Sequence, residues 1–272
     1  MIFVIFMVYC EKVKNQGGKI MKTNIYNAAG GNATAINFGE KIDRGDFGRI
    51  NDDLQARFSD VEQVAFYEEQ DGVPLLQMAG GEFCGNATRS FACLLQELNP
   101  ERTEFEFFVS GFPGKVTATV KPLGNNRFFC EAIFKGMKGE VRQEEINGVS
   151  FIVVDLGGIK HIIVSEDDVS FDKSTYEFKM KEIKDSLGVN CEAVGVLWTK
   201  EQDGKIFMNP VVWVKSINTC YYETSCGSGS IAIGLAMQKD VEVVQPSGKE
   251  IKVAFNDNAI VLSSEMEKIM QL

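Results

Sequence analysis

Histidine is almost missing from this sequence of 272 residues, which has only His161. Seven cysteines are present, but no two of them have CxxC spacing. Structural zinc sites draw their ligands from closely spaced cysteines and histidines, so we expect no such site and no metal. A Ser-His-Asp or Cys-His apparatus would have only His161 as its base. An odd number of scattered cysteines also favours a reducing compartment, the cytoplasm, over a disulfide framework.

The sequence also lacks a basic patch and a long hydrophobic run. It has 28 Lys and Arg against 38 Asp and Glu, a net charge of −10, and the run at residues 179–184 (KMKEIK) alternates basic with apolar residues. Nucleic acids and anionic membranes repel a negative protein, so we expect neither as a partner. The apolar string at residues 1–9 (MIFVIFMVY) is too short to span a bilayer and has no basic region before it.

The first twenty residues invite a separate hypothesis. Gly17-Gly18-Lys19 stands just before Met21 and can be encoded by a purine-rich ribosome-binding sequence. We therefore expect that Met21 is the native start and that residues 1–20 are a translated leader; a natural N-terminal extension is the alternative. Intact-mass analysis of protein from the source organism decides between them.

The rest of the chain reads as an approximate duplication. Each half contains strands, one amphipathic helix, more strand, and a cysteine at the head of an apolar helix. No proline-rich linker separates the halves, so they are interpreted as two similar lobes. We expect an N-terminal lobe at residues 21–138, to which the last strand (258–272) returns, and a C-terminal lobe at residues 139–257. Short turn spacing predicts antiparallel sheet in each lobe.

Two strings carry the chemistry: GGEFCGNATRSFACLL at residues 80–95 and SCGSGSIAIGLAM at residues 225–237. Each places a cysteine, Cys84 or Cys226, before a glycine at a predicted helix start. Unpaired N–H groups there give a positive potential, which is expected to lower a thiol pKa from about 8.5 towards 7. The same N–H groups can bind a carboxylate, and Gly85 and Gly227 allow close approach.

Two such helix starts facing each other would form one pocket, with a sulfur on either side of a bound carbon. That arrangement suits proton removal from one face and delivery to the other. The cysteines would then share one proton and titrate as a coupled pair. The remaining cysteines outside the leader are interpreted as core residues: Cys93, Cys130, Cys191 and Cys220.

At these motifs the sequence resembles the diaminopimelate epimerase family, whose members use two cysteines and no cofactor. YNAAGGNATAI, DLGGIKH and GVNCEAV extend the resemblance over most of the chain from Asn24. It implies an α+β fold of two pseudo-symmetric lobes, each an antiparallel sheet wrapped around a central buried helix. It also implies that Cys84 and Cys226 are catalytic and that a small amino acid is bound between the lobes. The substrate-binding residues it implies are Asn32, Gly85, Asn86, Asn190, Gly227 and Ser228.

The departures from that family concern the far end of the substrate. The family's Glu-Arg pair ahead of the second cysteine is replaced by Ile217-Asn218. The family also uses two asparagines, and this sequence has Met78 at the first of these positions and Gly158 or Ile159 at the second. Without the arginine, a second substrate carboxylate loses its charge partner. The sequence therefore favours an amino acid with a single carboxylate.

Among relatives of this kind the sequence looks most like the cofactor-independent histidine racemases, through GGEFCGNA and ETSC. Glu223 is a candidate for holding the substrate ammonium or ring, and His161 for tuning the second cysteine; a solvated carboxylate and a structural histidine are the alternatives. An epimerase for diaminopimelate or lanthionine remains open. A non-catalytic amino-acid-binding or redox-sensing protein is a further alternative. The sequence also leaves open whether the chain forms a homodimer.

Overall fold

The computed structural model describes residues 13–14 and 20–272, so most of the proposed leader lies outside the described residues. The first half contains β1 (Val13–Lys14), β2 (Ile20–Ala28), β3 (Gly31–Gly39), η1 (Arg44–Asp46), α1 (Phe47–Arg57), β4 (Val61–Gln70), β5 (Val73–Met78), α2 (Gly85–Leu98), β6 (Glu104–Val109), β7 (Phe112–Gly124) and β8 (Arg127–Lys135). The second half contains β9 (Glu140–Ile146), β10 (Val149–Asp155), β11 (Lys160–Ser165), α3 (Tyr176–Ser186), β12 (Ala193–Gln202), β13 (Lys205–Val214), β14 (Thr219–Tyr222), α4 (Gly227–Met237), β15 (Val241–Val244), β16 (Glu250–Asn256) and β17 (Ala259–Gln271).

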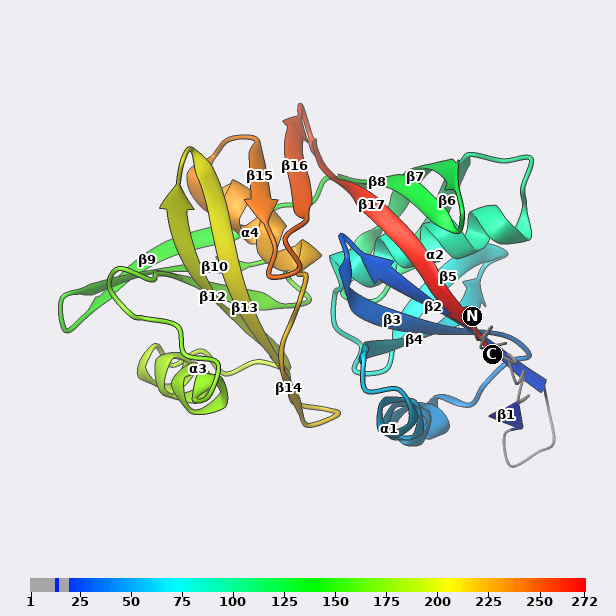
Figure 1. Cartoon of the computed structure of the whole chain (residues 1–272), viewed down its shortest axis with the longest axis horizontal. Helices are drawn as coiled ribbons and strands as arrows, with labels where there is room; N and C mark the ends of the chain where they lie inside the picture. The colour runs from blue at the N-terminus through cyan, green and yellow to red at the C-terminus, as the bar shows by residue number, and fades with distance from the viewer. Residues whose placement is uncertain (1–12, 15–19) are drawn as a thin grey trace, which may run out of the picture.

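The first half forms a closed barrel around α2. Neighbouring strands pair in the order β2, β3, β4, β5, β6, β7, β8 and β17, and β17 pairs back with β2. Every residue of α2 from Gly85 to Gln96 is buried. A helix that is buried on all sides needs apolar or small residues all round, and in the string ATRSFACLL only Arg89 departs from this rule. Figure 1 shows α2 inside this lobe and the long strand β17 running across it.

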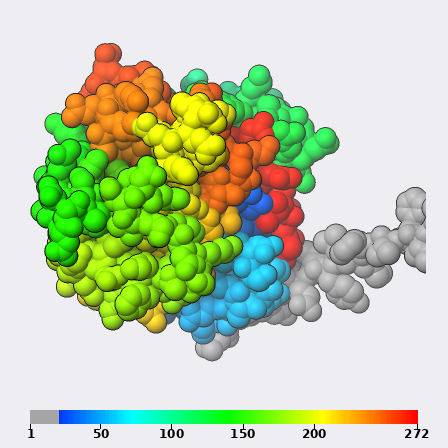
Figure 2. Space-filling view, turned by 60° about the vertical axis from the view of Figure 1, so that its left-hand side comes forward, coloured from blue at the N-terminus to red at the C-terminus, as the bar shows by residue number. Residues whose placement is uncertain are grey.

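The second half repeats the plan around α4. Its strands pair from β9 through β10, β11, β12 and β13 to β15 and β16, and β16 pairs with the start of β17. The first eight residues of α4, Gly227 to Gly234, are all buried. Because β17 pairs with β16, β8 and β2, it joins the two lobes. In Figure 2 the green-to-orange lobe packs directly against the cyan and red surface of the first lobe.

The expectation of purely antiparallel sheets is wrong, because both sheets are mixed. The parallel pairs are β3 with β4, β5 with β6, β11 with β12, and β13 with β15. Each pair is joined by a connection that contains a helix, in order α1, α2, α3 and α4. Parallel neighbours require a crossover of this length, whereas the short turns seen in the sequence mark only the hairpins.

The other two helices cover the outside of the sheets. Helix α1 packs Phe47, Ile50 and Leu54 against the first sheet, and α3 packs Met180 and Ile183 against the second.

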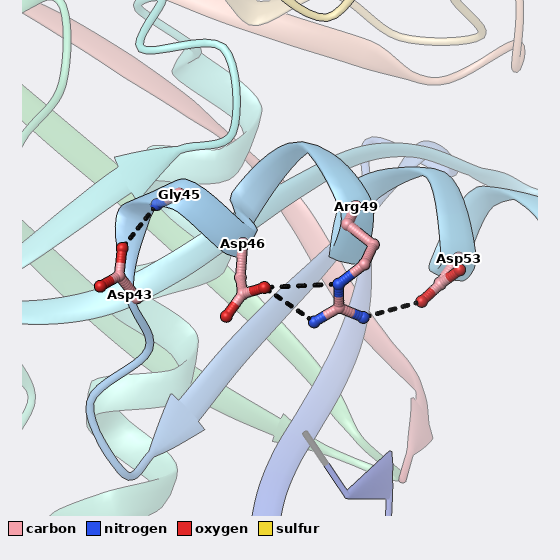
Figure 3. Close-up of polar contacts among 5 residues, drawn as sticks. All are labelled: Asp43, Gly45, Asp46, Arg49 and Asp53. Carbon is pink, nitrogen blue, oxygen red and sulfur yellow. Dashed lines mark hydrogen bonds and ion pairs between the residues drawn. The ribbon is translucent and has the colours of Figure 1, made fainter. Parts of the chain in front are cut away.

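The exposed side of α1 is held by local polar contacts (Figure 3). Asp43 accepts a hydrogen bond from the Gly45 N–H at 2.8 Å, and Arg49 pairs with Asp46 at 3.0 Å and Asp53 at 3.3 Å. Such exposed pairs stabilise a helix by only a few tenths of a kcal/mol each. None of the helices in the described part of the chain is long and apolar enough to cross a membrane.

Candidate active site

Cys84 and Cys226 occupy the same position in the two lobes, the residue just before a central helix. Their backbone angles nearly coincide, with φ −131° and ψ 112° for Cys84 and φ −136° and ψ 106° for Cys226. The Ala87 N–H donates to the Cys84 sulfur at 3.3 Å, so the first turn of α2 is directed at this thiol. The duplicated sequence pattern thus corresponds to duplicated geometry.

The two helix starts touch each other. A Cβ added to Gly85 would lie 3.1 Å from the backbone carbon of Gly227, and one added to Gly227 would lie 3.0 Å from that of Gly85. Asn86 crosses the junction and donates from Nδ2 to the Ser225 carbonyl at 2.8 Å. The glycines are therefore required for close approach of the two helices, and the junction brings both cysteines to one pocket.

The pocket between the lobes contains acids and apolar groups. It is lined by Glu62, Gln63, Val64, Glu82, Phe83, Cys84, Asn86, Ile159, Val212, Val214, Ile217, Thr219, Tyr221, Glu223, Cys226, Gly227 and Ser228. Three of these side chains are carboxylic acids, and no lysine or arginine is among the described residues that line it. Such a lining suits a cationic ligand and offers no charge partner to a second carboxylate.

Burial makes the three carboxyl groups weak acids. It raises the pKa of Glu62 and of Glu82 to about 7 and, together with the charge of Glu62, that of Glu223 to about 8. Glu62 accepts hydrogen bonds from Thr224 at 2.8 Å and Asn32 at 3.2 Å, which partly oppose the rise in its pKa. At neutral pH these groups share fewer than three negative charges, and a bound cation would favour their ionisation.

These raised pKa values predict how stability depends on pH. The folded protein holds protons on these carboxyl groups at pH values where the unfolded chain, with pKa values near 4.5, has lost them. The melting temperature of the ligand-free protein should therefore fall by several degrees between about pH 6.5 and 8. His161 opposes this fall only weakly. Burial lowers its pKa to about 3, and in the unfolded chain, where its pKa is about 6.5, the single imidazole has half of its proton left to lose at pH 6.5, against three carboxyl groups. Calorimetry checks this; a smaller fall in Glu223→Gln supports the assignment, and a rising melting temperature contradicts it.

The expectation that the helix starts lower the thiol pKa values is wrong. Burial and the nearby Glu223 raise the pKa of Cys84 to about 12 and that of Cys226 well above its usual value. Backbone N–H groups of α2, from Ala87 and Asn86, lower the pKa of Cys84 but are outweighed. The sequence showed the helix starts but not the depth of burial or the acids opposite them.

A chain of polar contacts connects the two thiols. Cys84 donates to Gln63 Oε1 at 2.7 Å, and Gln63 Nε2 donates to Glu223 Oε1 at 3.0 Å. Glu223 in turn shares a side-chain hydrogen bond with Cys226. A change in protonation at Cys226 therefore acts directly on Glu223 and, through Gln63, on the surroundings of Cys84.

Several of the sequence-predicted residues meet at this pocket. Cys84, Asn86, Glu223, Cys226, Gly227 and Ser228 line it, and Gly85 forms the helix junction. Asn32 does not line the pocket, but its side chain donates a hydrogen bond to Glu62, which does. The backbone of Asn32 is in the left-handed conformation, with φ 50°. Asn190 is exposed after α3 and is not brought to the pocket, and Cys191 and Cys220 are only half-buried.

His161 also lies behind the lining, on β11. Its Nε2 is 2.9 Å from Ser228 Oγ, and that oxygen is 3.6 Å from the Cys226 sulfur. The histidine thus contacts the second cysteine through Ser228, and its lowered pKa keeps it neutral at physiological pH.

Sequence reasoning missed Glu62, Gln63 and Glu82. Glu82 stands two residues before Cys84 in GGEFCGNA, and Glu62 and Gln63 interrupt the apolar string VEQVAF of β4. The available signal was an acidic or amide residue placed next to the apolar, buried residues of a strand. The described residues contain no group of three or more His, Cys, Asp or Glu side chains placed to hold a metal ion.

The chain is similar to known histidine racemases. Residues 40–266 match the family described as the histidine racemase CntK N-terminal domain. A histidine racemase of Fusobacterium nucleatum is 29% identical over 210 residues, which cover 74% of this chain and 77% of the relative. One of Staphylococcus aureus is 25% identical, covering 85% and 87%.

Solved structures show the fold at much lower identity. A predicted epimerase of Pseudomonas aeruginosa superimposes with a TM-score of 0.65 at 12% identity, covering 93% of this chain and 98% of that one. A phenazine biosynthesis protein of the PhzF family from Enterococcus faecalis gives a TM-score of 0.57 at 13% identity, covering 92% and 97%. The chain therefore has a PhzF-like, epimerase-type fold.

Proposed function

Because the chain belongs to the histidine racemase CntK family, we propose that it interconverts L-histidine and D-histidine in a two-base reaction at Cα that uses Cys84, Cys226 and no cofactor. The observation that carries this proposal is the pair of cysteines at touching helix starts in a pocket with three acids. The family relationship supports histidine as the substrate, and the geometry supports Cys84 and Cys226 as the two bases.

In the proposed reaction one cysteine is a thiolate and the other a thiol. The thiolate removes the α-proton from one face of the substrate, and the thiol donates its proton to the opposite face of the carbanion. Each turnover exchanges the roles of Cys84 and Cys226, so the reverse reaction starts from the other thiolate. The carbanion carries its charge into the substrate carboxylate, which the N–H groups at the two helix starts would stabilise.

The acids of the pocket account for activation of the thiols. Glu223 disfavours a thiolate at both cysteines. A bound ammonium or imidazolium group would neutralise the carboxylates and lower the pKa of each thiol. Thiolate formation would then depend on the presence of a cationic amino acid, which protects the sulfurs when the site is empty.

The apolar end of the pocket favours histidine over a diacid. Ile159 and Ile217 line it at positions where the resembling diaminopimelate epimerases use polar or charged residues. A second substrate carboxylate placed there would be buried without a partner, at a cost of several kcal/mol. An imidazole ring can pack on these side chains while the acids accept its N–H groups.

Proton NMR in D2O tests the proposal. The reduced protein is incubated with a panel of L-amino acids, diaminopimelate and lanthionine, and each α-proton signal is followed. We expect loss of the signal for histidine together with loss of optical rotation. Exchange with a diacid would show that the substrate is misassigned, and no exchange with any compound would favour a binding or redox function.

The glycine junction gives a prediction of its own. Gly227→Ala would place a Cβ 2.9 Å from Asn86 Oδ1 and 3.0 Å from the Gly85 backbone, forcing the helix starts apart by a few tenths of an ångström. We expect the turnover number to fall by about tenfold or more, because the two sulfurs are no longer aligned on one carbon. Gly48→Ala in α1 is the matched control, since nothing lies within 4 Å of the added Cβ. Equal turnover of the two variants would contradict the role given to the junction.

A further inference from the structure

Arg89 is a fully buried cation in the second turn of α2, with 0% of its surface exposed. Its Nε donates to the Gly85 carbonyl at 3.2 Å, and its two terminal nitrogens donate to Asn86 Oδ1 and Ser264 Oγ. All three acceptors are neutral, and no ion pair links Arg89 to a carboxylate of the described residues. Burial lowers its pKa only to about 10, so the charge remains at neutral pH.

A buried charge without a counter-charge is costly. Taking an ion out of water costs several kcal/mol even after relaxation, and hydrogen bonds to neutral groups recover only part of that. An uncharged side chain such as methionine would fill the same space without this cost. The position of the charge therefore has to be explained by what lies next to it.

What lies next to it is the junction of the two helix starts. The Arg89 Nη2 would be 3.1 Å from a Cβ on Gly227, the residue that follows Cys226. Its other contacts, Gly85 and Asn86, directly follow Cys84. Each helix start already has a partial positive charge of about half a unit. The guanidinium adds a full charge at this junction, and Arg89 is not among the residues that line the pocket with the acids.

The titratable groups around this point are of two kinds. Thiols face Arg89 from its own helix, from β8 and from the start of α4, namely Cys84, Cys93, Cys130 and Cys226. Carboxyl groups face the two pocket thiols from β4 and from the segments before α2 and after β14, namely Glu62, Glu82 and Glu223. The acids favour neutral thiols, whereas Arg89 favours thiolates and any anion bound at the junction.

We propose that Arg89 is a positioning residue whose charge favours anions at the helix junction, namely the substrate carboxylate and the thiolates of Cys84 and Cys226. The inference rests on the two-cysteine reaction proposed above. Arg89 also orients Asn86, which crosses to the second lobe. Charge and orientation act together: the hydrogen bonds fix the junction, and the buried cation makes it attractive to an anion.

Thiol alkylation separates this role from a purely structural one. The rate of iodoacetamide modification of Cys84 and Cys226 is followed against pH by peptide mass spectrometry in wild type, Arg89→Met and Arg89→Lys. Methionine is an unbranched side chain without the charge, and lysine keeps the charge. Below the thiol pKa the alkylation rate is proportional to the thiolate fraction. We therefore expect both thiols to react about tenfold more slowly in Arg89→Met at each pH, and those of Arg89→Lys to react within about threefold of the wild-type rate.

Two controls keep the result decisive. Ser264→Ala removes one hydrogen bond of Arg89 but keeps its charge, so its alkylation rates should not change. Melting temperatures report stability separately, and Arg89→Gln replaces Arg89→Met if the latter fails to fold. Unchanged alkylation rates in a folded uncharged variant would overturn the inference.

A second readout concerns the carboxylate. In Arg89→Met the KM for histidine should rise about tenfold, while that for histidinamide, which lacks the carboxylate charge, should hardly change. An equal rise for both would contradict carboxylate recognition. Alkylation of the thiols can be measured whether or not the protein racemises histidine. If the wild-type protein shows no α-proton exchange, the proposed function is overturned, but the alkylation test of Arg89 still applies.

Discussion

Replacing Cys84 or Cys226 by alanine is expected to lower the rate of histidine racemisation by about 10³-fold or more. Each variant lacks the base on one face and the proton donor for the opposite direction, and a positioned acid or base contributes about 10²–10⁴-fold. Both side chains lie at helix starts in one pocket, and no other described cysteine lines it. Polarimetry measures the rate, and α-proton exchange in D2O shows whether one-sided proton removal survives.

The matched control is Cys191→Ala. Cys191 is half-buried beside α3, and its sulfur lies 3.2 Å from the Ala193 carbonyl, outside the pocket. This variant should racemise at the wild-type rate, and circular dichroism should show all three variants folded. A Cys84→Ala or Cys226→Ala protein that is folded and fully active would exclude the two-base reaction.

Glu223→Gln should have the next largest effect, a loss of about 100-fold in kcat/KM for histidine. Glu223 is buried, bonded to Gln63 at 3.0 Å and in contact with Cys226, so it couples substrate charge to both thiols. The amide keeps the shape but cannot neutralise a substrate cation, and losing a buried charge partner costs about 2–5 kcal/mol. The empty-site pKa of Cys226 should fall in the same variant, because the carboxylate that raises it is gone.

The pH profile makes this prediction specific. With its pKa raised to about 8, Glu223 ionises as pH rises through that value. The kcat/KM of the wild type should therefore increase over the pH range in which Glu223 ionises, and Glu223→Gln should lose that increase. Glu192→Gln is the control, since that side chain is 70% exposed and only pairs loosely with Lys215 at 3.6 Å. If Glu223→Gln keeps the wild-type pH profile of kcat/KM, the ionisation belongs to another group.

The sequence by itself predicted the two candidate bases and the two-lobed plan. A cysteine before a glycine and a buried helix, repeated once in each half, predicts Cys84 and Cys226 because a helix start has the same local signature wherever the helix lies. The amphipathic helix expected in each half is present, as α1 and α3, for the same reason. Local patterns of this kind depend on neighbours within a few residues.

Only the tertiary structure decided the electrostatics of the site. Glu62 comes from β4, Glu82 from the segment before α2 and Glu223 from the segment after β14, and their pKa values depend on burial and on one another. The mixed strand pairing and the charge of Arg89 at the junction likewise follow from long-range packing. Desolvation and Coulomb forces depend on distances in space, so the sequence named the thiols while the fold set their acidity.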